Sequence, residues 1–232
     1  MSGPGAPAVP GLAAPRGRID KRQAILDAAF AVFARAGYTQ AGVDVIAAEA
    51  GVAKATVYNH FQDKESLLQQ VISTEAERAL AENLAAVERL TDHGADLRTT
   101  LERVGLHLVR CYLDDRSWAL RRLLAAEVNQ FPDLLDAVQV RVADRVTEAI
   151  ADRLARLAVA GQLQLTDPLL AAEHFAALLT GSLDRRARLG TRRVPDPELR
   201  TVTRAAVHTF LRAFGTDPSP ARVQDRAARS LP

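Results

Sequence analysis

The residues with the clearest chemical potential lie in one short segment, residues 54–60 of the 232-residue chain. If the apolar Val57 and Phe61 face inward, the directions of the other side chains follow, because successive residues of a helix are rotated by about 100°. Ala55 and Asn59 then point outward. A small residue lets a helix approach another surface closely, and an amide hydrogen-bonds the edge of a base in the major groove. The pattern predicts a helix that reads double-stranded DNA.

Further polar side chains flank this outward face. Thr56 and Tyr58 lie beside it, and their hydroxyls can reach phosphate oxygens, which position a protein on DNA without specifying a sequence. Asp63 is the expected N-cap of the next helix, and Lys64 lies in that helix's first turn. The Lys64 ammonium group can pair with a phosphate beside the N–H groups of the helix N-terminus.

Two other predicted helices must hold this segment in place. Apolar residues recur at helical spacing over residues 20–36, where the helix stops at Gly37, and again over residues 43–50, where it stops at Gly51. Two short helices joined by a tight, glycine-containing turn form a helix-turn-helix, with residues 54–60 as its recognition helix. An alternative is a helix-turn-helix that packs on another protein and never meets DNA.

Residues 25–72 resemble the N-terminal domain of TetR-family repressors. Four motifs occur in order: the Gly-Tyr pair at 37–38, IAAEAGV at 46–52, TVYNHF at 56–61 and DKESLL at 63–68. The resemblance implies that the positions of Lys54, Ala55 and Asn59 approach bases, and that those of Thr56, Tyr58, His60 and Lys64 contact phosphates.

Two positions depart from the family pattern. The cap of the second helix is usually Ser or Thr, with its hydroxyl on a phosphate, but here it is Gly42, preceded by Ala41. The third helix often opens with Ser, and here Ala53 stands there. Gly42 still permits the turn, but hydrogen bonds to phosphate are lost. A basic arm offers compensation, although a solvated tail explains it equally well; its residues are Arg16, Arg18, Lys21 and Arg22.

The rest of the chain predicts an all-α domain, giving about nine helices in total and a long fourth helix that joins the two domains. Helical stretches are expected at 96–113, 117–130, 132–159, 167–189 and 196–214. Pro132, Pro168 and Pro197 stand where helices begin, with Asp167 and Asp196 as caps for the last two.

Residues 121–139 are similar to the ligand-domain helix pair of AefR-like proteins in this family. That resemblance implies a ligand cavity for a small-molecule effector. Aromatic residues with one polar atom suit the wall of such a cavity, although each residue taken alone is an ordinary core residue. The candidate ligand-binding residues are His107, Cys111, Tyr112, Trp118, Asn129, Phe131 and Phe175.

The last two predicted helices each carry an apolar stripe, which the resemblance assigns to the interface of a homodimer. The alternative is that both stripes face the core of a single chain. A two-fold dimer would present two recognition helices to a palindromic operator. The candidate interface residues are Phe175, Leu179, Leu183, Val202, Ala206 and Phe210.

Other function classes find less support in the sequence. His107 and Cys111 share a helix face, but two ligands are too few for a metal site, and no cofactor is expected. The sequence favours an inert buried thiol at Cys111 over a redox sensor. Asp114 and Asp115 diverge on a helix end and fit a cap, so no enzyme is predicted. Open alternatives are activation instead of repression, and an architectural DNA-binding protein without an effector.

Composition sets the broad limits. The chain is 48% hydrophobic with a net charge of +2, so it can bury a core, and bulk charge gives no argument for nucleic acid. The apolar runs are too short for a membrane span, no signal peptide is apparent, and the single cysteine fits a reducing cytoplasm. We expect disordered tails at 1–18 and 216–232, a DNA-binding domain at 19–66, and a ligand-binding and dimerisation domain at 67–215.

Overall fold

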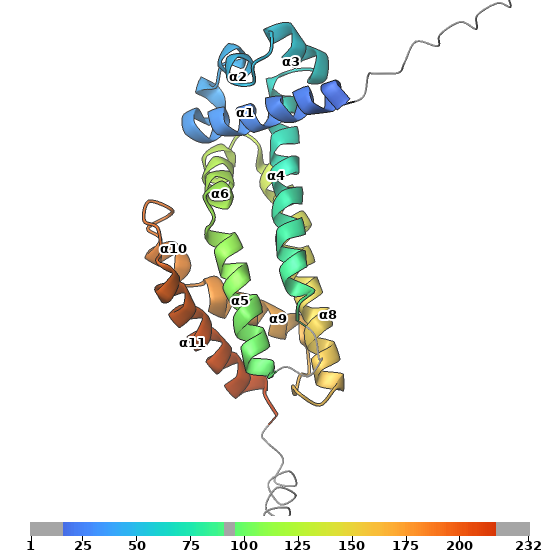
Figure 1. Ribbon diagram of the computed structural model, residues 1–232, viewed down its shortest axis with the longest axis vertical. Coiled ribbons are helices and arrows are strands. Elements are labelled where there is room, and N and C mark those ends of the chain that lie inside the picture. The colour runs from blue at the N-terminus through green and yellow to red at the C-terminus, as the bar shows by residue number, and fades with distance from the viewer. Residues whose placement is uncertain (1–15, 91–95, 217–232) are drawn as a thin grey trace, which may run out of the picture. The chain divides into compact units, whose positions relative to one another are not determined.

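A computed structural model describes residues 16–90 and 96–216, with the side chains of residues 16–19, 137 and 139 excepted. The two expected tails therefore lie almost entirely outside the described residues. The described part is helical and has no β-strand; Leu163 and Gly215 form one isolated bridge (Figure 1). The helices are α1 (Arg16–Gln40), α2 (Val43–Glu49), α3 (Lys54–His60), α4 (Lys64–Val87), α5 (Leu97–Leu113), α6 (Asp115–Glu127), α7 (Pro132–Val138), α8 (Arg145–Val159), α9 (Pro168–Thr180), α10 (Leu183–Arg186) and α11 (Asp196–Phe214).

This architecture confirms the all-α prediction, with two of the expected helices subdivided. The stretch predicted at 132–159 consists of α7, a π-helical segment (Gln139–Asp144) and α8. The stretch predicted at 167–189 divides into α9 and α10. The chain separates into two compact units, an N-terminal unit up to Val71 and a C-terminal unit from Ile72, and α4 runs through the boundary.

The N-terminal unit packs α1, α2, α3 and the start of α4 around a small core. Its fully buried side chains include Ile25, Phe33, Ile46 and Leu68. The helix predicted to stop at Gly37 is interrupted there, because that residue adopts φ 72°, although the stretch assigned to α1 continues to Gln40. Such a backbone conformation favours glycine, which has no Cβ to clash.

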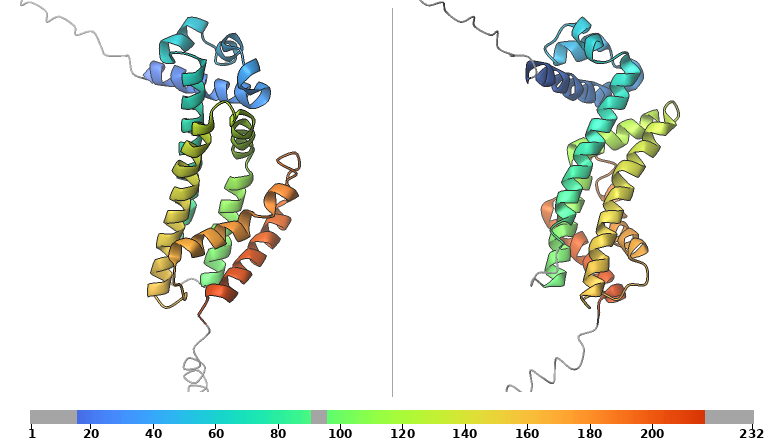
Figure 2. Two further views of the ribbon diagram at one scale, coloured as in Figure 1. Left: turned by 180° about the vertical axis from the view of Figure 1, so that it is seen from behind. Right: turned by 90° about the vertical axis from the view of Figure 1, so that its right-hand side faces the viewer.

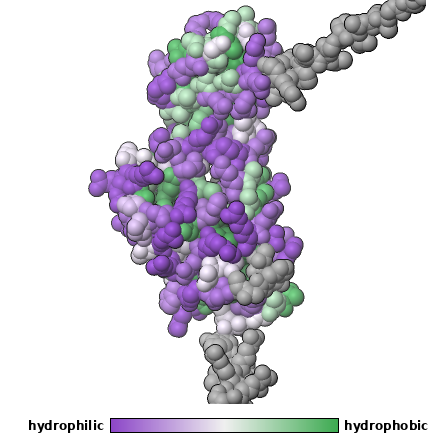
Figure 3. Space-filling view, in the orientation of Figure 1, coloured by the Kyte–Doolittle hydropathy of each residue, from purple (hydrophilic) through white to green (hydrophobic). Residues whose placement is uncertain are grey.

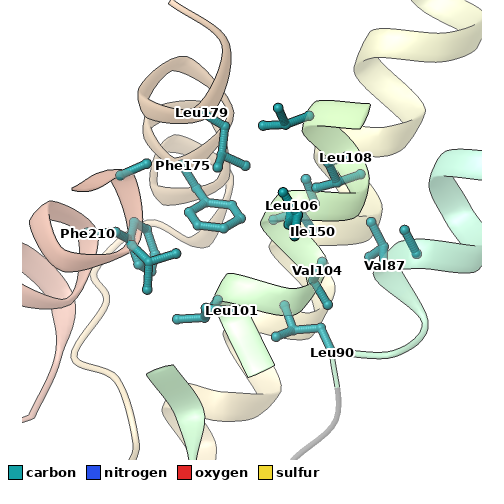
Figure 4. Packing of buried hydrophobic residues seen from close by; sticks show 14 of the residues in the cluster. Val87, Leu90, Leu101, Val104, Leu106, Leu108, Ile150, Phe175, Leu179 and Phe210 are labelled. Atoms are coloured by element: carbon teal, nitrogen blue, oxygen red, sulfur yellow. The ribbon is translucent and has the colours of Figure 1, made fainter. Parts of the chain in front are cut away.

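The C-terminal unit has α5 in contact with α6, α9 and α11, and α9 also lies against α8 (Figures 1 and 2). Large side chains from α4, α5, α8, α9 and α11 meet in its core, as Figure 4 shows. Phe175 and Phe210 pack edge to face with ring centroids 5.0 Å apart. Leu101 and Ile150 are likewise fully buried, so the core joins α5, α8, α9 and α11.

In the C-terminal unit, two of the predicted caps are present and a third is not. Asp167 caps α9 by accepting hydrogen bonds from the N–H groups of Leu169 (2.9 Å) and Leu170 (3.0 Å). Asp114 caps α6 in the same way. Asp196 does not cap α11, because Pro195 holds that position and the Asp196 carboxylate instead pairs with arginines.

Candidate nucleic-acid interface

Helix α3 presents the predicted polar face to solvent. Val57 is 2% exposed and Phe61 is 5% exposed, so both face the core of the N-terminal unit. Tyr58, on the flank of the outward face, is 47% exposed. Lys54, Ala55 and Asn59 are also exposed, and Thr56 and His60 are half-buried at the flanks.

The turn between α2 and α3 depends on Gly51. Its φ is +66°, a left-handed conformation that side-chain-bearing residues rarely adopt. The N–H groups of Gly51 and Val52 donate to the carbonyls of Ala48 (3.2 Å) and Ala47 (3.0 Å), which closes the end of α2. A Cβ at Gly51 would meet no atom within 4 Å, so backbone strain alone selects glycine.

Lys54 is held by a neighbour that the sequence analysis did not single out. Its Nζ lies 2.9 Å from Oδ2 of Asp44 on α2, and both side chains remain largely exposed. The hydrogen bond from Lys54 to Asp44 raises the pKa of the lysine, and their Coulomb attraction adds to it. The pair links the two helices of the motif.

Lys64 is positioned by the turn that ends α1. Its Nζ donates to the carbonyl of Thr39 (3.2 Å) and lies 4.5 Å from the centroid of the Tyr38 ring. This cation–π contact gives the Gly-Tyr pair a structural role, because the kink at Gly37 delivers the ring to Lys64.

The first turn of α4 is closed by a reciprocal cap. Asp63 Oδ1 accepts from the Ser66 N–H (2.7 Å), while Ser66 Oγ accepts from the Asp63 N–H (3.1 Å). The Ser66 N–H, as the largest influence, lowers the pKa of the Asp63 carboxyl. The cap fixes the start of the helix that carries Lys64.

The two departures from the family pattern leave helix ends without side-chain caps. Gly42 precedes α2 and Ala53 precedes α3, and neither supplies a cap hydrogen bond. The predicted basic arm is part of α1, which begins at Arg16. Arg22 lies over the Phe61 ring at 5.4 Å and Lys21 is exposed, while the side chains of Arg16 and Arg18 lie outside the described residues.

The predicted ligand residues lie in different surroundings within the C-terminal unit. Phe175 is fully buried against Phe210, and Asn129 is exposed beyond the end of α6. Phe131 is half-buried just before α7. His107 is half-buried on α5 and lines a hollow of about 400 Å³.

Tyr112 and Trp118, which were predicted to line a cavity, stack on an arginine side chain instead. The Arg121 guanidinium lies between their rings, 3.9 Å from the Tyr112 centroid and 4.1 Å from that of Trp118. The Tyr112 hydroxyl donates to Oδ1 of Asp184 (2.9 Å). Burial lowers the pKa of Arg121 and raises that of Tyr112. Aromatic stacking of a cation therefore occupies both rings.

Cys111 is a half-buried thiol on α5. Burial raises its pKa to about 11, and the nearby carboxylates of Glu82 and Asp114 add to the effect. A thiol with that pKa is almost entirely protonated at neutral pH, which removes the chemical basis for a redox sensor. Among the described residues, no group of three His, Cys, Asp or Glu side chains is arranged to hold a metal ion.

The residues predicted to form a dimer interface require correction. They are between 0% and 8% exposed in the single chain, because the apolar stripes of α9 and α11 pack on α5 and α8. Their burial leaves almost no surface with which to meet a second copy. The corrected residues, which belong to the core, are Phe175, Leu179, Leu183, Val202, Ala206 and Phe210.

Sequence reasoning also missed a charged cluster that joins α4 to α6. Glu75 is only 3% exposed, and Arg116 donates to it through Nε (2.9 Å) and through a second guanidinium nitrogen. Arg78 donates to Glu75 (3.2 Å) and to Glu82 (2.7 Å), and lies 3.6 Å from Asp114. The sequence did offer a signal for this cluster, because Glu75 is a charged residue on the inward face of a predicted helix.

The arginines of residues 185–193 are only partly the solvated surface that charge patterning favours. Arg186 and Arg192 both pair with Glu198, at 2.9 and 2.8 Å. These hydrogen bonds, led by Arg192, lower the pKa of the Glu198 carboxyl. They fasten the loop to the first turn of α11.

The fold and the exposed face of α3 define a transcriptional regulator with a helix-turn-helix and a second helical domain. A family model described as the AefR-like transcriptional repressor C-terminal domain matches residues 99–216, and one for bacterial regulatory proteins of the tetR family matches residues 25–71. The chain belongs to the TetR family of transcriptional regulators, with an AefR-like C-terminal domain. As the sequence predicts, its relatives are regulators and not enzymes.

Individual relatives and solved structures agree. The transcriptional activator FasR of Mycolicibacterium smegmatis is 30% identical over 140 residues, which are 60% of this chain and 61% of FasR. The regulator SrpR of Pseudomonas putida is 44% identical over 55 residues, 24% of this chain and 26% of SrpR. Both matches therefore span less than two thirds of the relative.

Solved structures match over nearly their full length. A TetR-family regulator from Mesorhizobium loti has a TM-score of 0.79 at 29% identity, covering 86% of this chain and 98% of that one. The flavonoid-responsive regulator FrrA has a TM-score of 0.68 at 26% identity, with the same coverage. In the described part of this chain, no helix is both long and apolar enough to cross a membrane.

Proposed function

We propose that the chain is a ligand-responsive repressor that binds a palindromic operator as a homodimer and is released by a small molecule. The outward face of α3 carries the proposal, because Tyr58 is 47% exposed while Val57 and Phe61 are buried beneath it. A recognition helix of this kind places base-reading residues in the major groove. DNA binding also implies action in the bacterial cytoplasm.

The proposed DNA contacts divide into two classes. Lys54, Ala55 and Asn59 lie nearest the bases, with the amide of Asn59 suited to an adenine edge. The remaining contacts are to phosphate, which fixes the register of the protein on the duplex. The phosphate-contacting residues are Gly42, through its backbone, Thr56, Tyr58, His60 and Lys64.

The homodimer is proposed to form through the outward faces of α9 and α11. On α9, Leu170 is 47% exposed and Leu178 is 37% exposed. His174, between them, stacks on Phe214 with ring centroids 6.2 Å apart, which places this edge of α9 beside α11. Ala205 and Thr209 are exposed on α11, and small residues there allow two helices to approach closely. Two recognition helices about 34–36 Å apart would enter successive major grooves.

Repression is favoured by the family description, which names an AefR-like repressor. The relative FasR is named an activator, so the sign of regulation is part of the test. FrrA is named flavonoid-responsive, and we propose a small-molecule effector for this chain as well. An effector shifts the equilibrium only by its different affinities for the DNA-bound and free forms.

The test of DNA binding uses a palindromic sequence from upstream of the protein's own gene and a random duplex of equal length. The native chain should bind the palindrome at least about a thousandfold more tightly than the random duplex. The variant Tyr58→Phe/Lys64→Ala should lose most of this affinity. The control Tyr112→Phe/Arg185→Ala also removes one hydroxyl and one cation, but from the C-terminal unit, and should bind like the native chain. Failure to select any preferred sequence from genomic DNA would overturn the proposal.

The test of the dimer compares two leucines of similar exposure. Leu170→Glu places a charge on the proposed interface, and Leu135→Glu, at a site that is 40% exposed on α7, does not. Light scattering should show a monomer for the first variant and a dimer for the second. A dimer that survives Leu170→Glu/Leu178→Glu would place the interface elsewhere.

A further inference from the structure

We infer that the hollow of about 400 Å³ on the C-terminal unit binds a small oxyanion with an apolar body, and that this ligand is the effector. The role of this ligand as the effector rests on the proposed function, whereas the binding site itself is argued from the residues that line it. The hollow lies along α5, between α11 and the end of α4. Figure 3 shows the face over α5 and α11 as mainly hydrophilic, with small apolar patches between.

Arginine dominates the wall of the hollow. Five guanidinium groups line it, from Arg89, Arg103, Arg110, Arg200 and Arg204, and Glu102 is the one carboxylate among the lining residues described. Cations that no carboxylate neutralises repel one another in so small a space, and an anion between them would relieve that repulsion. Planar guanidinium groups match carboxylates and phosphates by paired hydrogen bonds.

The arginines fall into two groups. Arg110 and Arg200 both donate to Asp196, at 3.0 and 2.9 Å, and Arg110 is the main cause of the lowered pKa of that carboxyl. Arg89, Arg103 and Arg204 have no carboxylate partner among the residues described. The paired arginines fix one wall, and the others keep their donors available for a ligand.

A buried hydroxyl adds a second, independent observation. Thr203 lines the hollow and is 1% exposed, yet its Oγ1 has no hydrogen-bond partner among the described groups. Helical Thr147, Thr180 and Thr201 all donate to the carbonyl four residues earlier, at 2.8 to 2.9 Å. A buried hydroxyl without a partner is costly, and an oxyanion beside it would accept a hydrogen bond from it.

The rest of the lining defines the size and apolar part of the ligand. Ala86, Val104 and Leu106 are buried and supply the apolar floor. A space of about 400 Å³ is in the range that proteins use for small organic ligands. The ligand is therefore a carboxylate or phosphate monoester with an attached hydrocarbon group.

The position of the hollow explains how such a ligand could act on DNA binding. Helix α4 begins at Lys64, a proposed phosphate contact, and ends at Val87 between the lining residues Ala86 and Arg89. A ligand that contacts the end of α4 and the side of α11 has a different affinity for each arrangement of these helices. That difference is the coupling free energy an effector requires.

Calorimetry on the full chain tests the site with three probes of similar size. 3-Phenylpropionate carries a carboxylate, phenyl phosphate carries a phosphate, and 3-phenylpropan-1-ol is the neutral match. At least one anion should bind ten times more tightly than the alcohol, and the better of the two identifies the head group. Equal binding of all three would overturn the inference.

Matched variants locate the binding. Arg103→Gln/Arg204→Gln should weaken anion binding at least tenfold. The control Arg98→Gln/Arg212→Gln makes the same changes on the same two helices outside the hollow and should leave binding unchanged. Equal weakening by both variants would mean that bulk charge binds the probe, and would overturn the site.

The effector role is tested separately, with the operator present. The bound anion should change operator affinity at least fivefold in the native chain, and this change should vanish in Arg103→Gln/Arg204→Gln. Binding of the anion without any change in operator affinity would overturn the effector assignment. Absence of operator binding in the unliganded chain would overturn the proposed function instead, while the calorimetric result still decides the site.

Discussion

The two units of this molecule differ in whether the residues that suggested a function are exposed. In the N-terminal unit, the residues suited to DNA chemistry stand exposed on α3, above the buried Val57 and Phe61. In the C-terminal unit, most residues that suggested a ligand site or an interface are core or already paired, as Phe175 and Tyr112 show. Helical spacing identifies a face, but whether that face meets solvent or the chain's own core depends on the packing of other helices.

The largest expected effect tests whether the α9 stripe is core. Phe175→Ala removes a fully buried ring and should lower the free energy of unfolding by about 3–5 kcal/mol. Leu169→Ala, at a site 47% exposed on the same helix, should stay within about 0.5 kcal/mol of the native chain. Urea unfolding measures both. Similar, small losses of stability in the two variants would mean that Phe175 is not a core residue.

A second prediction concerns the reactivity of Cys111. With its pKa at about 11, the thiol should react with a disulfide reagent on the order of 100 times more slowly than an ordinary thiol near neutral pH. The rate should rise about tenfold per pH unit until the pH approaches that pKa. The same chain unfolded in urea is the control and should react at the ordinary rate. Equal rates in the folded and unfolded chain would contradict the burial of Cys111.

The charged cluster sharpens the comparison, because it is a polar feature inside the C-terminal unit. Glu75→Gln breaks the pair with Arg116 and should cost about 1–3 kcal/mol, less than a fully buried pair, since the Arg116 side chain is 41% exposed. The exposed Glu77→Gln on the same helix is the control, with a change within about 0.5 kcal/mol. Thermal unfolding measures both variants, and equal melting temperatures would contradict the role of Glu75.

The smallest expected effect lies in the N-terminal unit. Asp44→Asn frees Lys54 and removes a negative charge near the proposed phosphate contacts, so operator affinity should rise a few-fold. Asp136→Asn makes the same change in the C-terminal unit and should have no effect. A double-mutant cycle with Lys54→Ala measures the coupling. A loss of affinity in Asp44→Asn would mean that the pair positions Lys54 instead of restraining it.

Local chemistry made much of the fold predictable from the sequence. Gly37 and Gly51 mark backbone reversals that the structure contains, and Asp167 caps α9 beside Pro168. Each of these features depends on residues a few positions apart. The outward and inward faces of α3 follow from the same short-range spacing, which predicts that Ala55 and Asn59 are exposed and that Val57 is buried.

Features that depend on distant residues could not be predicted in this way. The Arg121 guanidinium stacks on residues nine and three positions away, but the hydroxyl of Tyr112 is held by Asp184 from another helix. Asp196 reads as a cap, yet Arg110 from α5 takes its carboxylate. The arginines of the hollow come from α5, α11 and the turn after α4, so no linear spacing connects them.

The pair between Lys54 and Asp44 has a consequence for ionic strength. Cations condensed on DNA are released when a protein binds, and each neutralised phosphate contributes about −0.9 to the slope of log affinity against log salt. In the proposed operator complex, Lys54 gives up its pair with Asp44 in order to reach DNA. Salt screens that exposed pair as well, so the cost of breaking it falls as salt rises, and the complex should tolerate changes in salt better than its number of cationic contacts suggests.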